Sequence, residues 1–294
     1  SKFAKASQIE NEPTVKLFEG EIVLVIIGIF GFILSAGIAI YMLFRGSIIL
    51  PEGNVKDAFS FNAAIGTYIL SIAAILPLTR LNSARRKAVR RLFIFTSLYC
   101  YTIETVQNFR GISPRFSREG TVVDMAAGIL FGVVSLVLVG LAVVLTVHFL
   151  RLKKPTQRPL LIMGIRYAFI SVLAANIAGL WMILLQDRLT GVTGNIIVLH
   201  GIGFHALQTL VLPAWLLEKA VINESFKKRL IHAGCIAWLL MIVMIGIQTA
   251  LGHSVFEITG LPIMAFLLFL IWFGTVVVAC MLRFKKRKKL TVTA

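Results

Sequence analysis

The chain has 294 residues, of which 58% are hydrophobic and 15% are charged, and its mean hydropathy is +0.89. These values lie outside the range of soluble globular domains. The formal net charge of +17 would suit a nucleic-acid partner, but the basic residues are confined to short segments between long apolar runs. That placement favours orientation in a membrane, so no nucleic acid is expected as a partner.

Eight apolar runs follow one another along the chain, and each is long enough to cross the roughly 30 Å hydrocarbon core of a bilayer as a helix. They are continuous rather than alternating with a period of two, which indicates helices and not barrel strands. The sequence therefore predicts an all-α polytopic integral membrane protein, with about eight transmembrane helices in one bundle and both termini cytoplasmic. The runs cover residues 22–44, 59–79, 92–109, 122–150, 160–186, 196–217, 231–251 and 262–282.

The distribution of basic residues gives the orientation. If the runs span the membrane, 23 of the 30 lysines and arginines fall on the side of the two termini, and six fall on the other side. The positive-inside rule makes the first side cytoplasmic and predicts a multi-pass protein of the cell membrane. The expected parts are a cytoplasmic N-terminal segment (1–21), a transmembrane domain (22–282) and a polybasic cytoplasmic tail (283–294), with anionic lipids as partners of the cytoplasmic face.

Polar residues inside the apolar runs are candidates for a site, because inserting them in lipid costs about 2.5 to 3.5 kcal/mol each. In the third run Glu104, Gln107 and Asn108 recur at three- and four-residue steps, which places them on one face of a helix in the outer half of the membrane. In the sixth run His205 and Gln208 share a face, and Gln248 lies near the outer end of the seventh. We expect these groups to gather at similar depth.

Transport or solute binding from the outer side is the function that this set favours. The predicted substrate or proton site comprises Glu104, Gln107, Asn108, His205, Gln208 and Gln248, with Glu104 as the proton or cation site. A small molecule or ion is then the expected ligand. An enzymatic activity is less favoured, and an oligomer is compatible with the pattern.

A redox protein that binds heme or quinone is the alternative, because histidines on different helices can ligate heme iron. The candidate heme or metal ligands are His200, His205, His253, His148 and His232. The third hypothesis is a metal-dependent membrane hydrolase that uses Glu104, Asp124 and the outer histidines, although the sequence lacks the H-E-x-x-H motif. No strong internal repeat is evident, and the three cysteines have no spacing typical of a zinc site or a disulfide framework.

Overall fold

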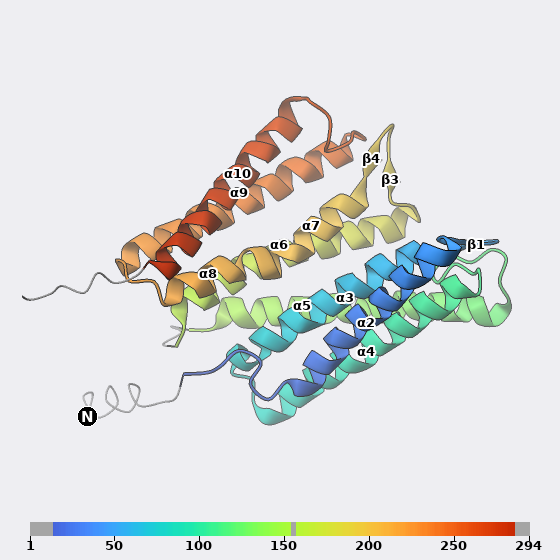
Figure 1. Cartoon of the computed structure of the whole chain (residues 1–294), viewed down its shortest axis with the longest axis horizontal. Helices are drawn as coiled ribbons and strands as arrows, with labels where there is room; N and C mark the ends of the chain where they lie inside the picture. Colours follow the sequence, from blue (N-terminus) through green and yellow to red (C-terminus); the bar gives the residue numbers. More distant parts are fainter. Residues whose placement is uncertain (1–13, 154–156, 286–294) are drawn as a thin grey trace, which may run out of the picture. The chain divides into compact units, whose positions relative to one another are not determined.

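The structure, a computed structural model, describes residues 14–153 and 157–285. These residues form long helices and two short antiparallel hairpins (Figure 1), which confirms the predicted all-α fold class. The helices are α2 (Ile22–Arg45), α3 (Val55–Ile75), the 3-10 turn η1 (Leu76–Thr79), α4 (Ser83–Phe109), α5 (Val122–Arg151), α6 (Pro159–Leu185), α7 (Ile196–Thr209), α8 (Val211–Glu218), α9 (Glu224–Ala250) and α10 (Gly260–Phe284). The hairpins pair β1 (Ile48–Ile49) with β2 (Gly53–Asn54), and β3 (Leu189–Thr190) with β4 (Gly194–Asn195).

Seven of the described helical segments are long and apolar enough to cross a membrane, with α7 and α8 counted as one segment. The chain is therefore a multi-pass helical membrane protein by the length and composition of its helices. The helix at the predicted third span, α4, is not among the seven. Its first turns carry five basic residues and its last turns are polar, so the whole helix is less apolar than the others.

Two helices begin well before the apolar runs that predicted them. α4 starts at Ser83 rather than 92, and α9 at Glu224 rather than 231. An asparagine caps each start: Asn82 Oδ1 accepts the amide of Arg85 at 2.9 Å, and Asn223 Oδ1 accepts that of Ser225 at 2.8 Å. Because an N-cap satisfies the unpaired amides of a first turn, it fixes where a helix begins. Hydropathy marks only the apolar part of each helix.

The contacts divide the chain into two compact units, whereas one bundle was expected from the sequence. The N-terminal unit is Val15–Val144, and the C-terminal unit begins at Leu145, within α5. The predicted segment 1–21 and the polybasic tail lie largely outside the described residues.

In the N-terminal unit α2 packs along α3, and α3 packs against α4 (Figure 1). Gly28 of α2 and Gly66 of α3 bring the two backbones into contact, since a Cβ on Gly66 would lie 2.7 Å from Gly28 O. Small residues at such a crossing allow close packing of membrane helices. Ile69 and Ile72 of α3, which follow Gly66 in the sequence, are fully buried, and so is Phe93 of α4.

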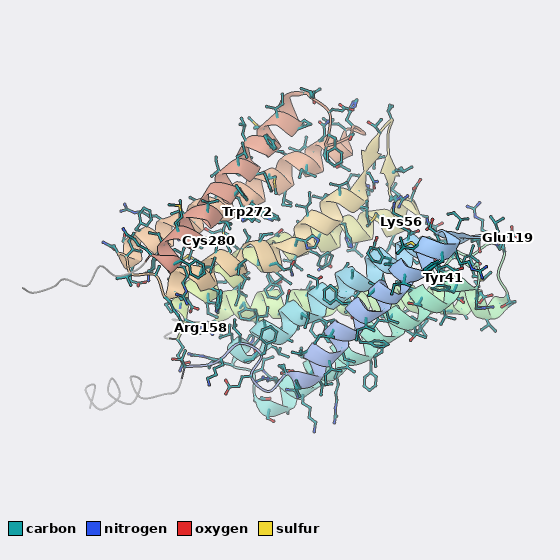
Figure 2. All side chains as sticks on the ribbon, in the orientation of Figure 1. Tyr41, Lys56, Glu119, Arg158, Trp272 and Cys280 are labelled. Carbon is teal, nitrogen blue, oxygen red and sulfur yellow. The ribbon has the colours of Figure 1, made fainter. Side chains whose placement is uncertain are left out.

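In the C-terminal unit α6 packs against α7, and α9 packs against α10. The break between α7 and α8 precedes Pro213, which has no amide hydrogen to donate to the carbonyl of Thr209. The indole N–H of Trp272 in α10 (labelled in Figure 2) donates to Thr209 O instead, at 2.9 Å. The carbonyl of Thr209, which the proline leaves without its helical partner, is thereby hydrogen-bonded within the apolar segment.

The two units repeat the same order of elements, and the hairpins and the helices that follow them recur at a constant distance along the chain. β1 and β2 recur as β3 and β4 at an offset of 141 residues (194 − 53), and both ends of α4 recur in α9 at the same offset. The repeat is hidden in the sequence because its residues differ. Within α4, only Lys87, Leu98 and Gln107 have an identical residue at the equivalent position of α9.

The repeated contacts centre on two glycines, Gly111 after α4 and Gly252 after α9, with φ of 75° and 80°. Each carbonyl receives an amide of the neighbouring hairpin: Glu52 N to Gly111 O at 2.8 Å, and Thr193 N to Gly252 O at 3.1 Å. A side chain at either glycine would enter the hairpin, because an added Cβ on Gly252 would lie 2.7 Å from Gly191 Cα and one on Gly111 would overlap a hairpin carbonyl. Glycine suits both the positive φ and the close approach.

Ion pairs fasten the helix ends that lie opposite the hairpins in each unit. The fully buried carboxylate of Glu21, at the start of α2, accepts Arg86 Nε at 2.8 Å and Arg90 Nε at 2.7 Å. In the C-terminal unit Arg158 (labelled in Figure 2) pairs with Glu218 at 2.6 Å. Basic residues that the sequence assigns to orientation therefore also hold neighbouring segments together.

Candidate functional site

The buried carboxylate of Glu104, on α4, is the centre of the polar end of the N-terminal unit. Only 1% of its side chain is exposed, and its partner is Arg115 in the loop between α4 and α5. Glu104 Oε2 lies 3.0 Å from Arg115 Nη2, and Oε1 lies 3.5 Å from Nη1. A cation this close offsets the large cost of burying a charged carboxylate.

Arg115 is held from three sides. Its guanidinium carbon lies 5.0 Å from the ring centroid of Phe61 on α3 and 4.6 Å from that of Phe131 on α5, while Glu104 faces the edge. Aromatic faces attract such a cation, so the two rings help to hold the guanidinium in place. The side chain is still 36% exposed, and its hydrogen bond to Glu104 uses Nη1, one of the three nitrogens that together carry five N–H groups. Arg115 can therefore offer donors to a second acceptor.

The predicted residues Gln107 and Asn108 are buried beside Glu104 and join α4 to its neighbours. Gln107 Nε2 donates to Asp124 Oδ1 of α5 at 2.9 Å, and Arg110 Nη1 pairs with the same oxygen at 2.7 Å. Asn108 Oδ1 accepts the amide of Asn54 in β2 at 3.1 Å. Both amides therefore position α4, and the structure places them around the ion pair rather than in an open space.

Glu52, in the β1–β2 hairpin, ties the loop that carries Arg115. Its carboxylate accepts the hydroxyl of Ser117 at 2.6 Å and the amide of Arg118 at 2.9 Å. Partial burial raises the pKa of Glu52, but the hydrogen bonds from Arg118, Ser117 and Ser113 outweigh that effect, and the pKa lies below its ordinary value. The ionised carboxylate thus fastens the loop over the end of the unit.

Two buried acceptor oxygens near the end of α4 have no hydrogen-bond donor among the described residues. Asn62 of α3 donates from Nδ2 to Thr105 Oγ1 at 2.9 Å, yet its Oδ1 accepts no hydrogen bond. Glu104 Oε2 also accepts none, because its contact with Arg115 is an ion pair without hydrogen-bond geometry. Buried polar atoms are nearly always bonded, so an exception of this kind often marks a functional site.

In the C-terminal unit the predicted residues Gln248 and His253 meet through Glu257, in the loop between α9 and α10. Gln248 Nε2 lies 2.9 Å from Ser254 O and 3.4 Å from Glu257 Oε2. His253 Nδ1 lies 3.3 Å from Glu257 Oε1. Gln248 is buried and closes this loop, as its counterpart Gln107 does in the other unit.

The two histidines of α7 lie in different surroundings. His205 is exposed, and its Nδ1 lies 3.0 Å from Gln208 Oε1, which agrees with the predicted shared face of these two residues. His200 is half-buried, and its Nδ1 lies 2.8 Å from the carbonyl of Ala175 on α6. A carbonyl only accepts, so Nδ1 of His200 carries the hydrogen. Neither contact brings His200 together with His205.

The remaining candidate ligands lie on α5 and α9. His232 is exposed and its Nδ1 lies 2.6 Å from the hydroxyl of Tyr167, while His148 lies beside Phe149 in α5. In the part of the chain that the structure describes, no three His, Cys, Asp or Glu side chains are grouped so as to hold a metal ion. The five histidines thus form no common cluster there.

The internal repeat shows which polar residues the fold does not need. The positions equivalent to Glu104 and Asn108 are Ile245 and Thr249, and the loop after α9 contains no arginine. The C-terminal unit nevertheless forms the same glycine turn, the same hairpin and the same helix end. The Glu104–Arg115 pair is therefore an addition to a turn that folds without it.

The pairing of Glu104 with Arg115 and the role of Glu52 were missed by reasoning from the sequence. The signal that could have indicated them is the loop 110–121, where three arginines follow a span that contains one carboxylate. No protein-family model, curated protein or solved structure matches this chain. The functional conclusion therefore comes from the geometry.

Proposed function

We propose that the chain crosses the cell membrane eight times, with α4 as the eighth spanning helix and both termini in the cytoplasm. α4 has 27 residues, or about 40 Å of helix, and it occupies the position in its unit that α9, an apolar spanning candidate, occupies in the other. Its five basic residues all lie in the first nine positions, at the end where the positive-inside rule places the cytoplasm.

We propose further that this membrane protein binds and transports a small carboxylated solute at the Glu104–Arg115 pair. The observation that carries the proposal is the presence of this pair in one repeat only, because the other repeat forms the same helix end with Ile245 in place of Glu104. Ionisable residues inside a membrane domain are costly, and they are found where a function requires them.

The surroundings of Arg115 favour a carboxylate as the ligand. The rings of Phe61 and Phe131 hold the guanidinium in place, and a planar guanidinium binds a carboxylate through two parallel hydrogen bonds. The exposed fraction of Arg115 gives a solute access to the N–H groups that do not face Glu104.

The test is binding of acetate, succinate and benzoate to the purified full chain, measured as a concentration-dependent rise in its thermal unfolding temperature. We expect at least one of the three to stabilise the wild type and the control Arg188→Gln, which changes an exposed arginine of the C-terminal unit. The double variant Glu104→Gln/Arg115→Gln removes both charges together and should fold but no longer respond. If none of the three acids stabilises the wild type, or if the double variant responds equally, the proposed function is wrong.

A further inference from the structure

We infer that binding of a carboxylate at Arg115 is coupled to the uptake of one proton by Glu104, so that solute and proton enter the site together. The inference rests on the proposed function, and it names the coupling ion for that site. It follows from how the charge of Glu104 is compensated.

Arg115 is the cation that faces Glu104 in the structure. From α3, Asp57 acts on Glu104 with a charge of the same sign, and Cys100 is the titratable neighbour on α4 itself. From α5, the carboxylate of Asp124 is occupied by Arg110 and Gln107. The amide of Asn108 approaches Glu104 Oε1 only at 3.5 Å. No second positive group in the described surroundings thus replaces Arg115 if a ligand engages it.

The balance of charge then requires one proton to bind to Glu104 together with the ligand. Without ligand, the carboxylate of Glu104 and the guanidinium of Arg115 sum to zero. A bound monocarboxylate such as acetate or benzoate brings one negative charge to a site where the side chain of Glu104 is 1% exposed, and an uncompensated charge is strongly disfavoured there. A proton from hydronium or a protonated buffer molecule that adds to Glu104 restores a sum of zero, because its positive charge cancels that of the bound carboxylate. The donor loses its bond to hydrogen, one O–H bond forms on Glu104, and no other bond in the protein or the ligand breaks.

The geometry of Glu104 suits this step. Oε2 accepts no hydrogen bond, so protonation there breaks none. What it weakens is the 3.0 Å ion pair with Arg115 Nη2, which the bound carboxylate replaces. The neutral acid still fits beside the guanidinium, which is kept in place by Phe61 and Phe131. The occupied site is then electrically neutral, and a neutral complex crosses a hydrocarbon core at much lower cost than a charged one.

The consequence is a specific pH dependence. Each proton bound together with the ligand makes the affinity rise about tenfold for each unit by which the pH falls, as long as Glu104 is ionised before binding and protonated after it. The solutes themselves, acetate, succinate or benzoate, stay ionised near neutral pH and do not supply this proton.

Calorimetric titration of the wild-type chain tests the coupling. The carboxylate that the thermal assay identifies is titrated at pH 7 in buffers of different ionisation enthalpy, which gives the number of protons taken up per ligand. We expect about one proton for the wild type and for the control Glu257→Gln, which changes a loop carboxylate of the C-terminal unit. For Glu104→Gln we expect none, with an affinity that does not change between pH 6 and pH 8.

The possible failures are distinguishable. If the carboxylate binds the wild type in a way that depends on Arg115 but with no proton uptake, the coupling is wrong and the proposed binding site stands. If no carboxylate binds, the proposed function fails and the coupling fails with it. The wild-type measurement decides the matter even if Glu104→Gln does not fold.

Discussion

Glu104 and Arg115 are eleven residues apart in the chain, and their charged groups come within 3.0 Å because the backbone reverses at Gly111. The amide of Gly111 donates to Asn108 O at 3.1 Å, and that of Ile112 donates to Gln107 O at 2.9 Å. These bonds close the end of α4 and return the loop over its last turn. The turn thereby places the guanidinium of Arg115 beside the buried carboxylate of Glu104.

Removing Arg115 alone should destabilise the protein. Arg115→Gln leaves Glu104 buried without a cation, and for a half-exposed partner we expect a loss of about 2 kcal/mol. Adding Glu104→Gln should recover most of that loss, since no charge is then left uncompensated. Chemical unfolding of the wild type, both single variants and the double variant gives the coupling energy. Strictly additive effects would show that the pair does not interact.

Replacing either of the repeated glycines, Gly111 or Gly252, should destabilise the protein. Gly111→Ala and Gly252→Ala each place a Cβ against hairpin atoms at a positive φ, so each should lose more than about 1 kcal/mol of stability. Gly132→Ala is the control, because a Cβ there meets no atom within 4 Å. Thermal unfolding in one detergent compares all three. Equal stability of the wild type and the two loop variants would contradict the assigned turn.

The hydrogen bonds of Glu52 should make the stability of the folded protein depend on pH. Its pKa is lowered in the folded protein, so its contribution is present above the unfolded value of about 4.3 and is lost as the pH falls through the lower folded value. Glu52→Gln should therefore unfold at a lower temperature than the wild type at pH 7, and the difference should shrink below pH 4. The exposed Glu119 (labelled in Figure 2) provides the control Glu119→Gln. A difference that stays constant from pH 7 to pH 3 would argue against the hydrogen bonds of Glu52.

The eight-span topology predicts opposite labelling of the two ends of α4. In a variant without Cys100, Cys235 and Cys280, a cysteine introduced by Glu119→Cys should react with an impermeant maleimide in intact cells. One introduced by Ala84→Cys should react only after the cells are opened. Reaction of both from the same side would show that α4 does not cross the membrane.

The fold was predictable where one physical signal dominates. Long apolar runs identify helices in lipid regardless of their neighbours, so the spans near α2, α5, α6 and α10 agree with the structure. The start of α4 was not predictable from hydropathy, because its first turns are basic and only the cap by Asn82 marks where the helix begins. The repeat was missed because backbone geometry is kept at Gly111 and Gly252 while the helix residues differ.

The candidate site was predictable only in part. Spacing alone placed Glu104, Gln107 and Asn108 on one face, and all three are buried. The same reasoning could not show that the face with His205 is exposed, since periodicity defines a face but not what it packs against. The partner of Glu104 depends on the path of a loop, which hydropathy does not describe.

Uptake of a radiolabelled carboxylate into proteoliposomes, with and without an inward proton gradient, tests the role of the Glu104–Arg115 pair most directly. Beyond the passive entry of the acid into protein-free liposomes, we predict that the gradient drives accumulation of the acid by the wild type and by Glu257→Gln, whereas Glu104→Gln shows no response to the gradient. Accumulation by Glu104→Gln that follows the gradient as the wild type does would contradict the account.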